Sequence, residues 1–263
     1  MSPGARLGRL CKKLLRLATR CVSLRLAASR CVSPRLAATC TDELFAALGE
    51  APYLEAVLAR PCIVCAAPIE GGGFADAIVG VGKVAAAIRT TQLLTARRPD
   101  WVLLIGVCGA YPGSGLDVGA LCLVGEELLA DEGVALADGG FLDLAAMGLG
   151  AIGPFAADPR RTAAAAAVLA APVVRGATVS SCSGHDALAS AIARRSGAAV
   201  ETMEGAAVLQ VCAHFGVPAV QLRCVSNRTG ERARGGWDLR GAIDRLHAAV
   251  RTLASAQGWK VSP

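Results

Sequence analysis

The sequence predicts an α/β fold of three layers, in which helices cover both faces of a central sheet that is mostly parallel or mixed. Its 263 residues, 54% of them hydrophobic, suit one large domain with a sizeable core. Short apolar runs alternate with longer segments of helical character, as in folds built from strand–helix–strand units. Residues 101–106 are apolar throughout, which is typical of a strand buried on both faces. Only 18% of the residues are charged, which excludes disorder for most of the chain.

The predicted elements follow one another in a regular order. Strands are expected at residues 36–40, 77–81, 101–106, 121–126, 177–182 and 219–225, and helices from Thr41 and over 83–96, 160–171, 203–215 and 239–256. Thr41 is a plausible N-cap for the first helix. Gly216 and Pro218 end the helix expected at 203–215. Ligands of such sheets bind beyond the carboxyl ends of the strands, so we expect the site there.

Charge is distributed unevenly along the chain. Residues 1–35 carry nine basic side chains and no acidic one, so residues 36–263 hold 18 basic and 21 acidic ones, a balance of −3. Residues 20–29 are nearly repeated as residues 30–39. We therefore expect residues 1–33 to be a dispensable basic extension and residues 34–263 to be a single domain. A transit peptide or a nucleic-acid-binding arm are the alternatives for the extension.

Several classes of protein are excluded by the composition. The longest apolar run has twelve residues, 163–174, and a bilayer span needs about 20. Nothing in the mildly acidic body resembles a surface for a nucleic-acid backbone. The eleven cysteines are scattered, only Cys62 and Cys65 form a C-x-x-C pair, and there are three histidines, so we expect no metal. Free thiols favour a cytoplasmic protein.

A nucleotide cofactor is not expected either. Residues 80–85 read G-V-G-K-V-A, but Val84 stands where a P-loop needs Ser or Thr. As a dinucleotide fingerprint the segment lacks a well-placed acid about 20 residues further on. The glycines are better explained by a tight turn and close packing of the following helix.

Five segments in order carry a more specific signal. They are TDEL (41–44), GVGKVAAA (80–87), IGVCGAYPGSG (105–115), VETMEGAA (200–207) and RCVSN (223–227). Together they resemble the nucleoside phosphorylase and nucleosidase superfamily. Within it, GAYPGSG (109–115), GFLDL (140–144) and SNRTG (226–230) resemble the futalosine hydrolase family. The resemblance covers the chain from about residue 34 to the C-terminal helix.

The resemblance implies a nucleoside phosphorylase-like fold and hydrolysis of futalosine to hypoxanthine and dehypoxanthinylfutalosine, a step in menaquinone biosynthesis. It also implies a homo-oligomer. Breaking an N-glycosidic bond builds positive charge on the ribose and negative charge on the leaving base, and a site must stabilise both. By resemblance, the Glu43 carboxylate orients the attacking water. Glu204 accepts bonds from the two ribose hydroxyls, and Met203 packs against the sugar.

Asn227 stands where relatives that act on 6-aminopurines carry Asp. An amide both donates and accepts hydrogen bonds, which suits N7 and O6 of a 6-oxopurine. Further substrate contacts are expected from Val107, Cys108, Gly109, Ser183, Gly184, Asp186, Arg223 and Ser226. The loop at 183–186 has one residue more than the Ser-Gly-Asp of the family, and His185 with Asp186 is an alternative acid–base pair. Cys108 is better explained as a small buried thiol than as a nucleophile.

The segment 104–109 has no basic or hydroxyl side chain, so phosphate would be poorly held and water is the expected nucleophile. Three alternatives stay open. One is another purine nucleosidase or phosphorylase of the same fold, acting on aminodeoxyfutalosine, methylthioadenosine or inosine. The second is a non-catalytic nucleoside-binding protein, against which Glu43, Glu204 and the polar group at 227 argue. The third is nucleic-acid binding through the basic extension, against which the acidic body argues.

Overall fold

The computed structural model describes residues 59–230 and 236–260. The predicted strand at 36–40, the helix from Thr41 and the basic extension lie outside these residues. The described elements are β1 (Cys62–Cys65), α4 (Pro68–Gly71), β2 (Ala77–Ile78), α5 (Lys83–Ala96), β3 (Val102–Ala110), β4 (Leu121–Leu129), β5 (Gly133–Ala135), β6 (Phe141–Asp143), β7 (Phe155–Ala156), α6 (Pro159–Leu169), β8 (Val173–Thr178), α7 (Asp186–Ser196), β9 (Val200–Thr202), α8 (Gly205–Phe215), β10 (Ala219–Arg228) and α9 (Leu239–Gln257).

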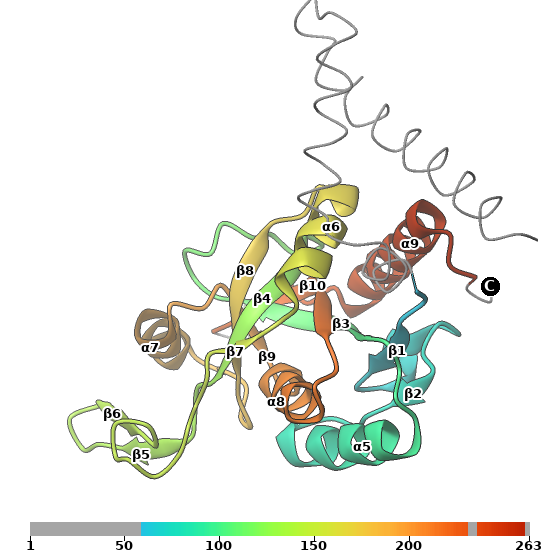
Figure 1. Ribbon diagram of the computed structural model, residues 1–263. Helices are drawn as coiled ribbons and strands as arrows, with labels where there is room; N and C mark the ends of the chain where they lie inside the picture. The colour runs from blue at the N-terminus through green and yellow to red at the C-terminus, as the bar shows by residue number, and fades with distance from the viewer. Residues whose placement is uncertain (1–58, 231–235, 261–263) are drawn as a thin grey trace, which may run out of the picture. The chain divides into compact units, whose positions relative to one another are not determined.

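The central sheet is mixed and closes on itself. Its hydrogen-bonded order is β10-β4-β8-β9-β3-β1-β2, and β10 also pairs with β3. The strands β1, β2, β3 and β10 run parallel where they pair, whereas β4 is antiparallel to β10, and β9 is antiparallel to β3. The predicted fold is thus confirmed in its mixed form. The hairpin of β5 and β6 stands apart from this sheet (Figure 1).

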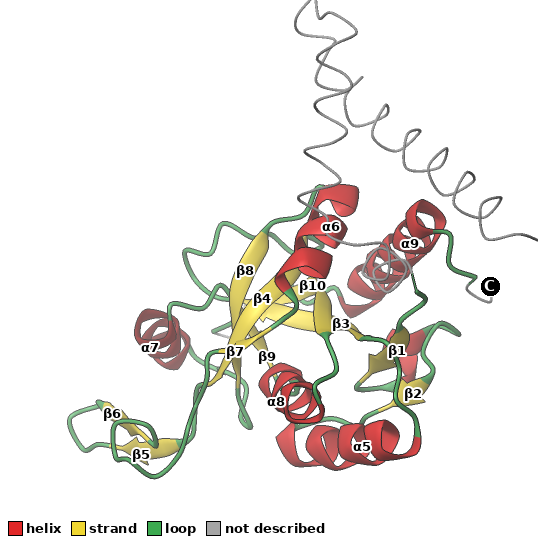
Figure 2. Ribbon diagram, viewed as in Figure 1, coloured by secondary structure: helices red, strands yellow, loops and turns green. Residues whose placement is uncertain are grey.

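Helices cover both faces of the sheet (Figure 2). Successive side chains of a strand point to opposite faces. Accordingly, Leu103 packs in a core cluster with residues of α6 and α9, and its neighbour Leu104 packs in a second cluster with residues of α5 and α8. The continuous apolar run of β3 follows from burial on both faces, as the sequence predicts.

The predicted helices agree well with the structure. Residues 83–96 form α5, and the helices expected at 203–215 and 239–256 are found as α8 and α9. Residues 177–182 were predicted as a strand, but β8 ends at Thr178 and begins at Val173. The sequence analysis also missed α7, although His185 caps it, Asp186 lies in its first turn and Arg194 and Arg195 in its last.

The topology brings three segments to one edge of the sheet. Because β1, β3 and β10 are parallel, their carboxyl ends meet there. The short helix α4 follows β1 at this edge. Strand β9 returns antiparallel to β3, with Glu201 opposite Gly109. The segment after β9 therefore runs along the same edge.

Candidate active site

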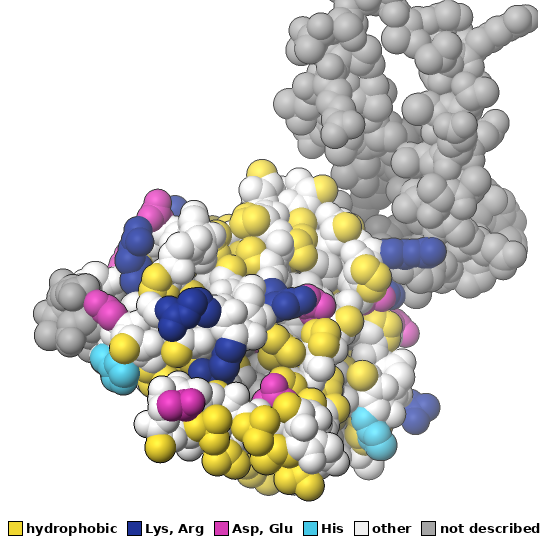
Figure 3. Space-filling model, turned by 90° about the vertical axis from the view of Figure 1, so that its left-hand side faces the viewer, with side chains coloured by type: hydrophobic (Ala, Val, Ile, Leu, Met, Phe, Trp, Pro, Cys, Tyr) yellow, Lys and Arg dark blue, Asp and Glu magenta, His cyan; other side chains and the backbone are white. Residues whose placement is uncertain are grey.

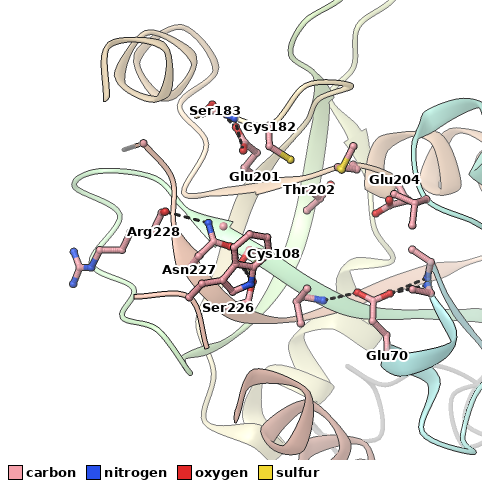
Figure 4. Close-up of a pocket in the computed structure, with 18 residues that line it drawn as sticks. Glu70, Cys108, Cys182, Ser183, Glu201, Thr202, Glu204, Ser226, Asn227 and Arg228 are labelled. Carbon is pink, nitrogen blue, oxygen red and sulfur yellow. Dashed lines mark hydrogen bonds between the residues drawn. The ribbon is translucent and has the colours of Figure 1, made fainter. Parts of the chain in front are cut away.

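A pocket of about 240 Å³ lies at this edge (Figure 4). Its lining comes from the ends of β1, β3, β9 and β10 and the segments that follow them. The lining residues are Ala66, Ala67, Glu70, Val81, Val107, Cys108, Gly109, Cys182, Ser183, Glu201, Thr202, Met203, Glu204, Ser226, Asn227, Arg228, Gly230 and Trp237.

Most of the predicted site residues line this pocket. They are Val107, Cys108, Gly109, Ser183, Met203, Glu204, Ser226 and Asn227. Gly184, Asp186 and Arg223 do not line it, and Glu43 lies outside the described residues. Segments that are more than a hundred residues apart in the sequence thus meet at one cavity. This supports the interpretation of the ordered motifs as a functional signal.

Glu70 on α4 is the buried carboxylate at one end of the pocket. Its Oε2 accepts hydrogen bonds from the backbone N–H groups of Ala66, at 3.1 Å, and Ala67, at 3.0 Å. Its Oε1 accepts from the N–H of Val107 at 2.9 Å. Three backbone donors therefore fix this carboxylate between the ends of β1 and β3. A carboxylate has about four acceptor positions, which leaves one for a ligand.

Glu204 lies at the same end, with 5% of its surface exposed. Its Oε1 accepts from the N–H of Gly82 at 2.9 Å. Burial raises the pKa of Glu204, whereas the charge of Arg223 and the Gly82 N–H lower it; the charge of Glu70 raises it further. Gly82 has φ of 89°, a conformation that side chains rarely adopt, so the glycine presents its N–H to the carboxylate.

Arg223 is buried next to this end, where it contacts the pocket residue Val107. Only 1% of it is exposed and it does not line the pocket, so the prediction that it contacts the substrate stays a prediction. Its Nη2 donates to Gln221 Oε1 at 3.1 Å, and its Nη1 donates to the carbonyl of Val107 at 3.4 Å. The buried guanidinium therefore acts on the pocket through its charge.

Asn227 lies at the opposite end of the pocket. Its Oδ1 accepts from the hydroxyl of Ser226 at 2.9 Å, and its Nδ2 donates to the carbonyl of Arg228 at 3.0 Å. These bonds fix which amide atom is oxygen and which is nitrogen. One N–H of the amide and one lone pair of its oxygen stay available for a ligand.

Glu201 is the second carboxylate at this end. Its Oε1 accepts from the N–H of Ser183 at 2.9 Å, and its Oε2 accepts from the hydroxyls of Tyr111, at 2.8 Å, and Ser183. Figure 4 shows Glu70 and Glu204 at one side of the pocket and Glu201 and Asn227 at the other. The pocket therefore has two polar ends of different composition.

The loop at 183–186 divides between pocket and helix. Ser183 reaches the pocket, but Asp186 lies in the first turn of α7, and the ring of His185 accepts from the N–H of Leu188 at 3.2 Å. Asp186 begins α7, and Gly184 lies two residues before it; neither lines the pocket. His185 therefore serves as a helix cap, and the alternative acid–base pair with Asp186 stays a prediction.

Cys108 lines the pocket with 4% of its surface exposed. A hydrogen bond with Cys122, followed by burial, raises the pKa of the Cys108 thiol well above its usual value. The thiol stays protonated, so it is a poor nucleophile. This agrees with the prediction of a small buried thiol.

Glu70 and Glu201 are two carboxylates of the pocket lining that the sequence did not predict. Glu70 follows β1 by five residues, and β1 itself, with four residues, was not predicted. Glu201 directly precedes Thr202-Met203-Glu204, the segment whose second carboxylate, Glu204, was predicted. For Glu70, the signal in the sequence was a carboxylate just beyond a short apolar strand.

No group of three or more His, Cys, Asp or Glu side chains in residues 59–230 and 236–260 is placed to hold a metal ion. No helix in the same ranges is long and apolar enough to cross a bilayer.

Comparison with known proteins gives related enzymes. The family model described as the phosphorylase superfamily matches residues 59–256. The chain is 37% identical to a futalosine hydrolase of Thermus thermophilus over 217 residues, which cover 81% of this chain and 95% of the relative. It is 32% identical to a 5'-methylthioadenosine/S-adenosylhomocysteine nucleosidase of Shewanella oneidensis over 189 residues, 66% of this chain and 75% of that one.

Solved structures share the fold. The native futalosine hydrolase of Helicobacter pylori gives a TM-score of 0.63 at 19% identity, over 73% of this chain and 96% of that one. A 5'-methylthioadenosine/S-adenosylhomocysteine nucleosidase of Colwellia psychrerythraea in complex with adenine gives 0.63 at 21% identity, over 76% and 96%. The resemblance predicted from the five segments is therefore confirmed at the level of family and fold.

Proposed function

The chain belongs to the phosphorylase superfamily, and on that premise we propose that it is a futalosine hydrolase. It would cleave the N-glycosidic bond of futalosine with water and release hypoxanthine and dehypoxanthinylfutalosine. The observation that carries the proposal is the pocket with two distinct ends. One end holds two glutamates suited to a ribose and a water, and the other an amide suited to a 6-oxopurine. The 37% identity to a futalosine hydrolase over nearly that relative's whole length supports the choice of substrate.

Glu204 binds the ribose in this proposal. Two vicinal hydroxyls match the two oxygens of one carboxylate, and a buried carboxylate favours ligands that restore its lost hydrogen bonds. Met203, the residue before Glu204, supplies an apolar surface for the sugar. Burial raises the pKa of Glu204, and the positive charge of Arg223 opposes part of that rise.

Glu70 orients the attacking water. Its three backbone donors leave it one acceptor position, and it lies at the same end of the pocket as Glu204. A water held there is placed next to the sugar and can transfer a proton to the carboxylate as it attacks the anomeric carbon. The sequence analysis gave this role to Glu43, which stays a prediction because it lies outside the described residues.

Asn227 assists the departure of the base. As the bond breaks, negative charge develops on the hypoxanthine, and a hydrogen bond from the amide to N7 or O6 stabilises it. An amide does not protonate the base at neutral pH. Stabilisation of the leaving group is therefore by hydrogen bonding without full proton transfer.

Water is the proposed nucleophile because the pocket offers phosphate no fixed cation. Arg228 is the one Lys or Arg among the described residues that line it. Its guanidinium is paired with Asp117, and 70% of its side chain is exposed. An exposed, already paired arginine holds phosphate weakly, whereas a phosphorylase needs firm binding.

Chromatography of the reaction products tests the proposal. Futalosine, aminodeoxyfutalosine, inosine and methylthioadenosine are each incubated with the protein, with and without phosphate. We expect hypoxanthine and dehypoxanthinylfutalosine from futalosine, at a rate that phosphate does not change. A sugar 1-phosphate product, or cleavage of methylthioadenosine in strong preference to futalosine, would overturn the assignment.

Three finer statements belong to the same proposal. We place the reaction in menaquinone biosynthesis, by the resemblance, and in the cytoplasm, in accord with the thiols of Cys62, Cys65, Cys108, Cys122, Cys212 and Cys224, which form no disulfide. We also propose a homo-oligomer, because large apolar side chains next to the pocket are exposed: Val81 by 59%, Val84 by 73% and Ile88 by 53%. Figure 3 shows further hydrophobic side chains gathered at the lower edge of the face that it displays. A monomer in analytical ultracentrifugation would contradict the oligomer.

A further inference from the structure

Glu127 on β4 is a fully buried carboxylate outside the pocket lining, and the proposed reaction gives it no role. Its Oε1 accepts from the hydroxyl of Thr178 at 2.9 Å and from that of Thr202, and its Oε2 accepts from Gln221 Nε2 at 2.5 Å. Within the part of the chain that the structure describes, its hydrogen-bond donors are thus neutral side chains. A neutral residue at this position would avoid the cost of burying a charge, so the carboxylate points to a role beyond packing.

The backbone around Glu127 leaves space for its carboxylate. A Cβ at Gly205, the first residue of α8, would collide with Glu127 Oε2, and a Cβ at Gly176 on β8 would lie 3.0 Å from Oε1. Both positions therefore need a glycine for the carboxylate to fit between β8 and α8. Glu127 lies against the N-terminal end of α8, where the partial positive charge of a helix favours an anion.

The first turn of α8 is capped from neighbouring strands. Glu204 is the N-cap residue, but its side chain makes no capping hydrogen bond. The N–H of Gly205 donates instead to the hydroxyl of Thr202 at 3.3 Å, and the N–H of Ala206 donates to that of Thr178 at 2.8 Å. An N-cap side chain normally accepts from an N–H of this turn. Because the two threonines take these donors, the Glu204 carboxylate is left to face the pocket.

Glu127 fixes the direction of these hydrogen bonds. An ionised carboxylate only accepts, and a hydroxyl has one hydrogen to donate. Each threonine therefore turns its hydrogen to Glu127 and its lone pairs to α8, although the two hydroxyls lie 3.2 Å apart. On the other side, Gln221 turns its Nε2 to Glu127, so its Oε1 faces Arg223 Nη2 at 3.1 Å. One carboxylate thus orders both the capping of α8 and the contact that holds Arg223 next to the pocket.

We propose that Glu127 is a positioning residue which, through Thr178 and Thr202, keeps the Glu204 carboxylate turned to the ribose and away from its own helix. The proposal rests on the proposed function, in which Glu204 binds the ribose hydroxyls. Without the threonine hydroxyls, the first N–H groups of α8 lose their acceptors, and Glu204, as the N-cap residue, is placed to replace them. The expected loss is therefore in recognition of the ribose and not only in stability.

The first test measures ribose recognition in variants of Thr178, which does not line the pocket. The ratio of kcat/KM for futalosine to that for its 3'-deoxy analogue is compared in the parent, Thr178→Val and Thr178→Ser. In Thr178→Val, which keeps the shape but loses the hydroxyl, the ratio should fall about 10- to 100-fold, the effect of one hydrogen bond to a charged group. Thr178→Ser keeps the hydroxyl and should keep the parent ratio. If Thr178→Val lowers both kcat/KM values by the same factor, or Thr178→Ser lowers the ratio as much, the proposal is overturned.

The second test reverses one hydrogen bond of the network. In Glu127→Gln, either Gln221 Nε2 meets the new amide donor to donor, or Gln221 turns over and presents its Nε2 to Arg223. Two donors face each other in both cases, so the same ratio should fall about 10-fold or more.

The double variant Glu127→Gln with Gln221→Glu is the matched control. In it the amide oxygen accepts from both threonines, the amide nitrogen donates to the new carboxylate, and that carboxylate accepts from Arg223. Every pairing is restored, so the ratio should return to within about threefold of the parent. A folded double variant that keeps the ratio of Glu127→Gln overturns the proposal.

Thermal unfolding of each variant is measured alongside the kinetics. The comparison of Thr178→Val with Thr178→Ser decides the matter even if Glu127→Gln does not fold. Failure of the parent protein to release hypoxanthine from futalosine overturns the proposed function itself. Normal release by the parent, with a ratio that no variant changes, overturns only the role of Glu127.

Discussion

Three glutamates, each held by a different set of donors, define the pocket at the scale of single residues. Glu70 is held by three backbone N–H groups, Glu204 by the Gly82 N–H and the charge of Arg223, and Glu201 by Tyr111 and Ser183. The donors leave each carboxylate able to accept from a ligand. Glu70 and Glu204 then have different proposed tasks, at the water and at the sugar.

Two substitutions distinguish the candidates for the water-orienting residue. Glu70→Gln should lower kcat about 10²- to 10⁴-fold with little change in substrate binding, because an amide cannot accept the proton of the water. Glu43→Gln is the matched control. It should leave kcat within about threefold of the parent, which is far less than the loss expected on removing a general base. Steady-state kinetics check both, with thermal unfolding of each variant as a test of folding. The reverse pattern would return the role to Glu43.

The pH dependence of binding reports on Glu204. Its pKa is raised from 4.5, so on acidification the carboxylate takes up a proton and loses an acceptor earlier than an ordinary glutamate. Affinity for the ribose should therefore fall at a pH above the usual range of a glutamate. The charge of Glu70 contributes to the raised pKa, so in Glu70→Gln the loss of affinity should move to lower pH.

Calorimetry with a carbon-linked analogue of futalosine, which the enzyme cannot cleave, measures both profiles. The same profile in parent and Glu70→Gln would show that the two carboxylates do not interact.

Asn227→Asp should shift base preference toward a 6-aminopurine. A protonated Asp donates to N7 and accepts from the 6-amino group, while an ionised one is repelled by O6 and N7. The ratio of kcat/KM for aminodeoxyfutalosine to futalosine should rise about 5- to 150-fold, the effect of one mismatched buried hydrogen bond. The variant also loses the donor that Asn227 gives to the carbonyl of Arg228, so its thermal midpoint is measured alongside. A constant ratio would show that Asn227 does not contact the base.

At the scale of elements, glycines determine how closely strands and pocket side chains approach. Gly82 begins α5 and supplies the N–H that holds Glu204, which explains the GVG segment without a nucleotide. Gly106 lies in β3 directly under the ends of Arg223 and Glu70. The site thus has glycines where charged side chains pass close to the backbone.

Gly106→Ala tests this close approach. The new Cβ would lie 2.4 Å from Arg223 Nη1 and 2.9 Å from Glu70 Oε1. Both side chains are buried and cannot move into solvent, so we expect a loss of about 1–3 kcal/mol in the free energy of unfolding and a lower kcat. Gly184→Ala is the control, because nothing lies within 4 Å of its Cβ. Urea denaturation and kinetics check both; equal stability of the two variants would contradict the packing argument.

At the scale of the whole molecule, the chain divides into a unit of Met1–Leu54 and a unit of Glu55–Pro263. The pocket and both core layers belong to the second. The family match begins at residue 59. This match does not test the prediction that the domain begins at residue 34, but truncation of the chain can test it.

A protein that begins at Ser33 should fold and keep full activity, as expected for a dispensable basic extension. If Glu70 and not Glu43 orients the water, a protein that begins at Glu55 should also keep activity within about tenfold, well inside the effect of losing a general base. Circular dichroism and product assays on both truncations decide. Loss of activity in the shorter protein alone would assign residues 33–54, including Glu43, to the active site.

The sequence by itself determined the fold class, the family and much of the pocket. Helix α5 and the pair Met203 and Glu204 were predictable, because helical periodicity and short motifs are local properties. Tertiary structure alone decided that Glu70 and Glu201 line the pocket and that Arg223 is buried. The four-residue β1 and three-residue β9 are too short for a periodic signal, and their position comes from hydrogen bonds to β3. Whether a carboxylate meets a cavity or solvent depends on which distant strands close around it, and that is set by packing of the whole sheet.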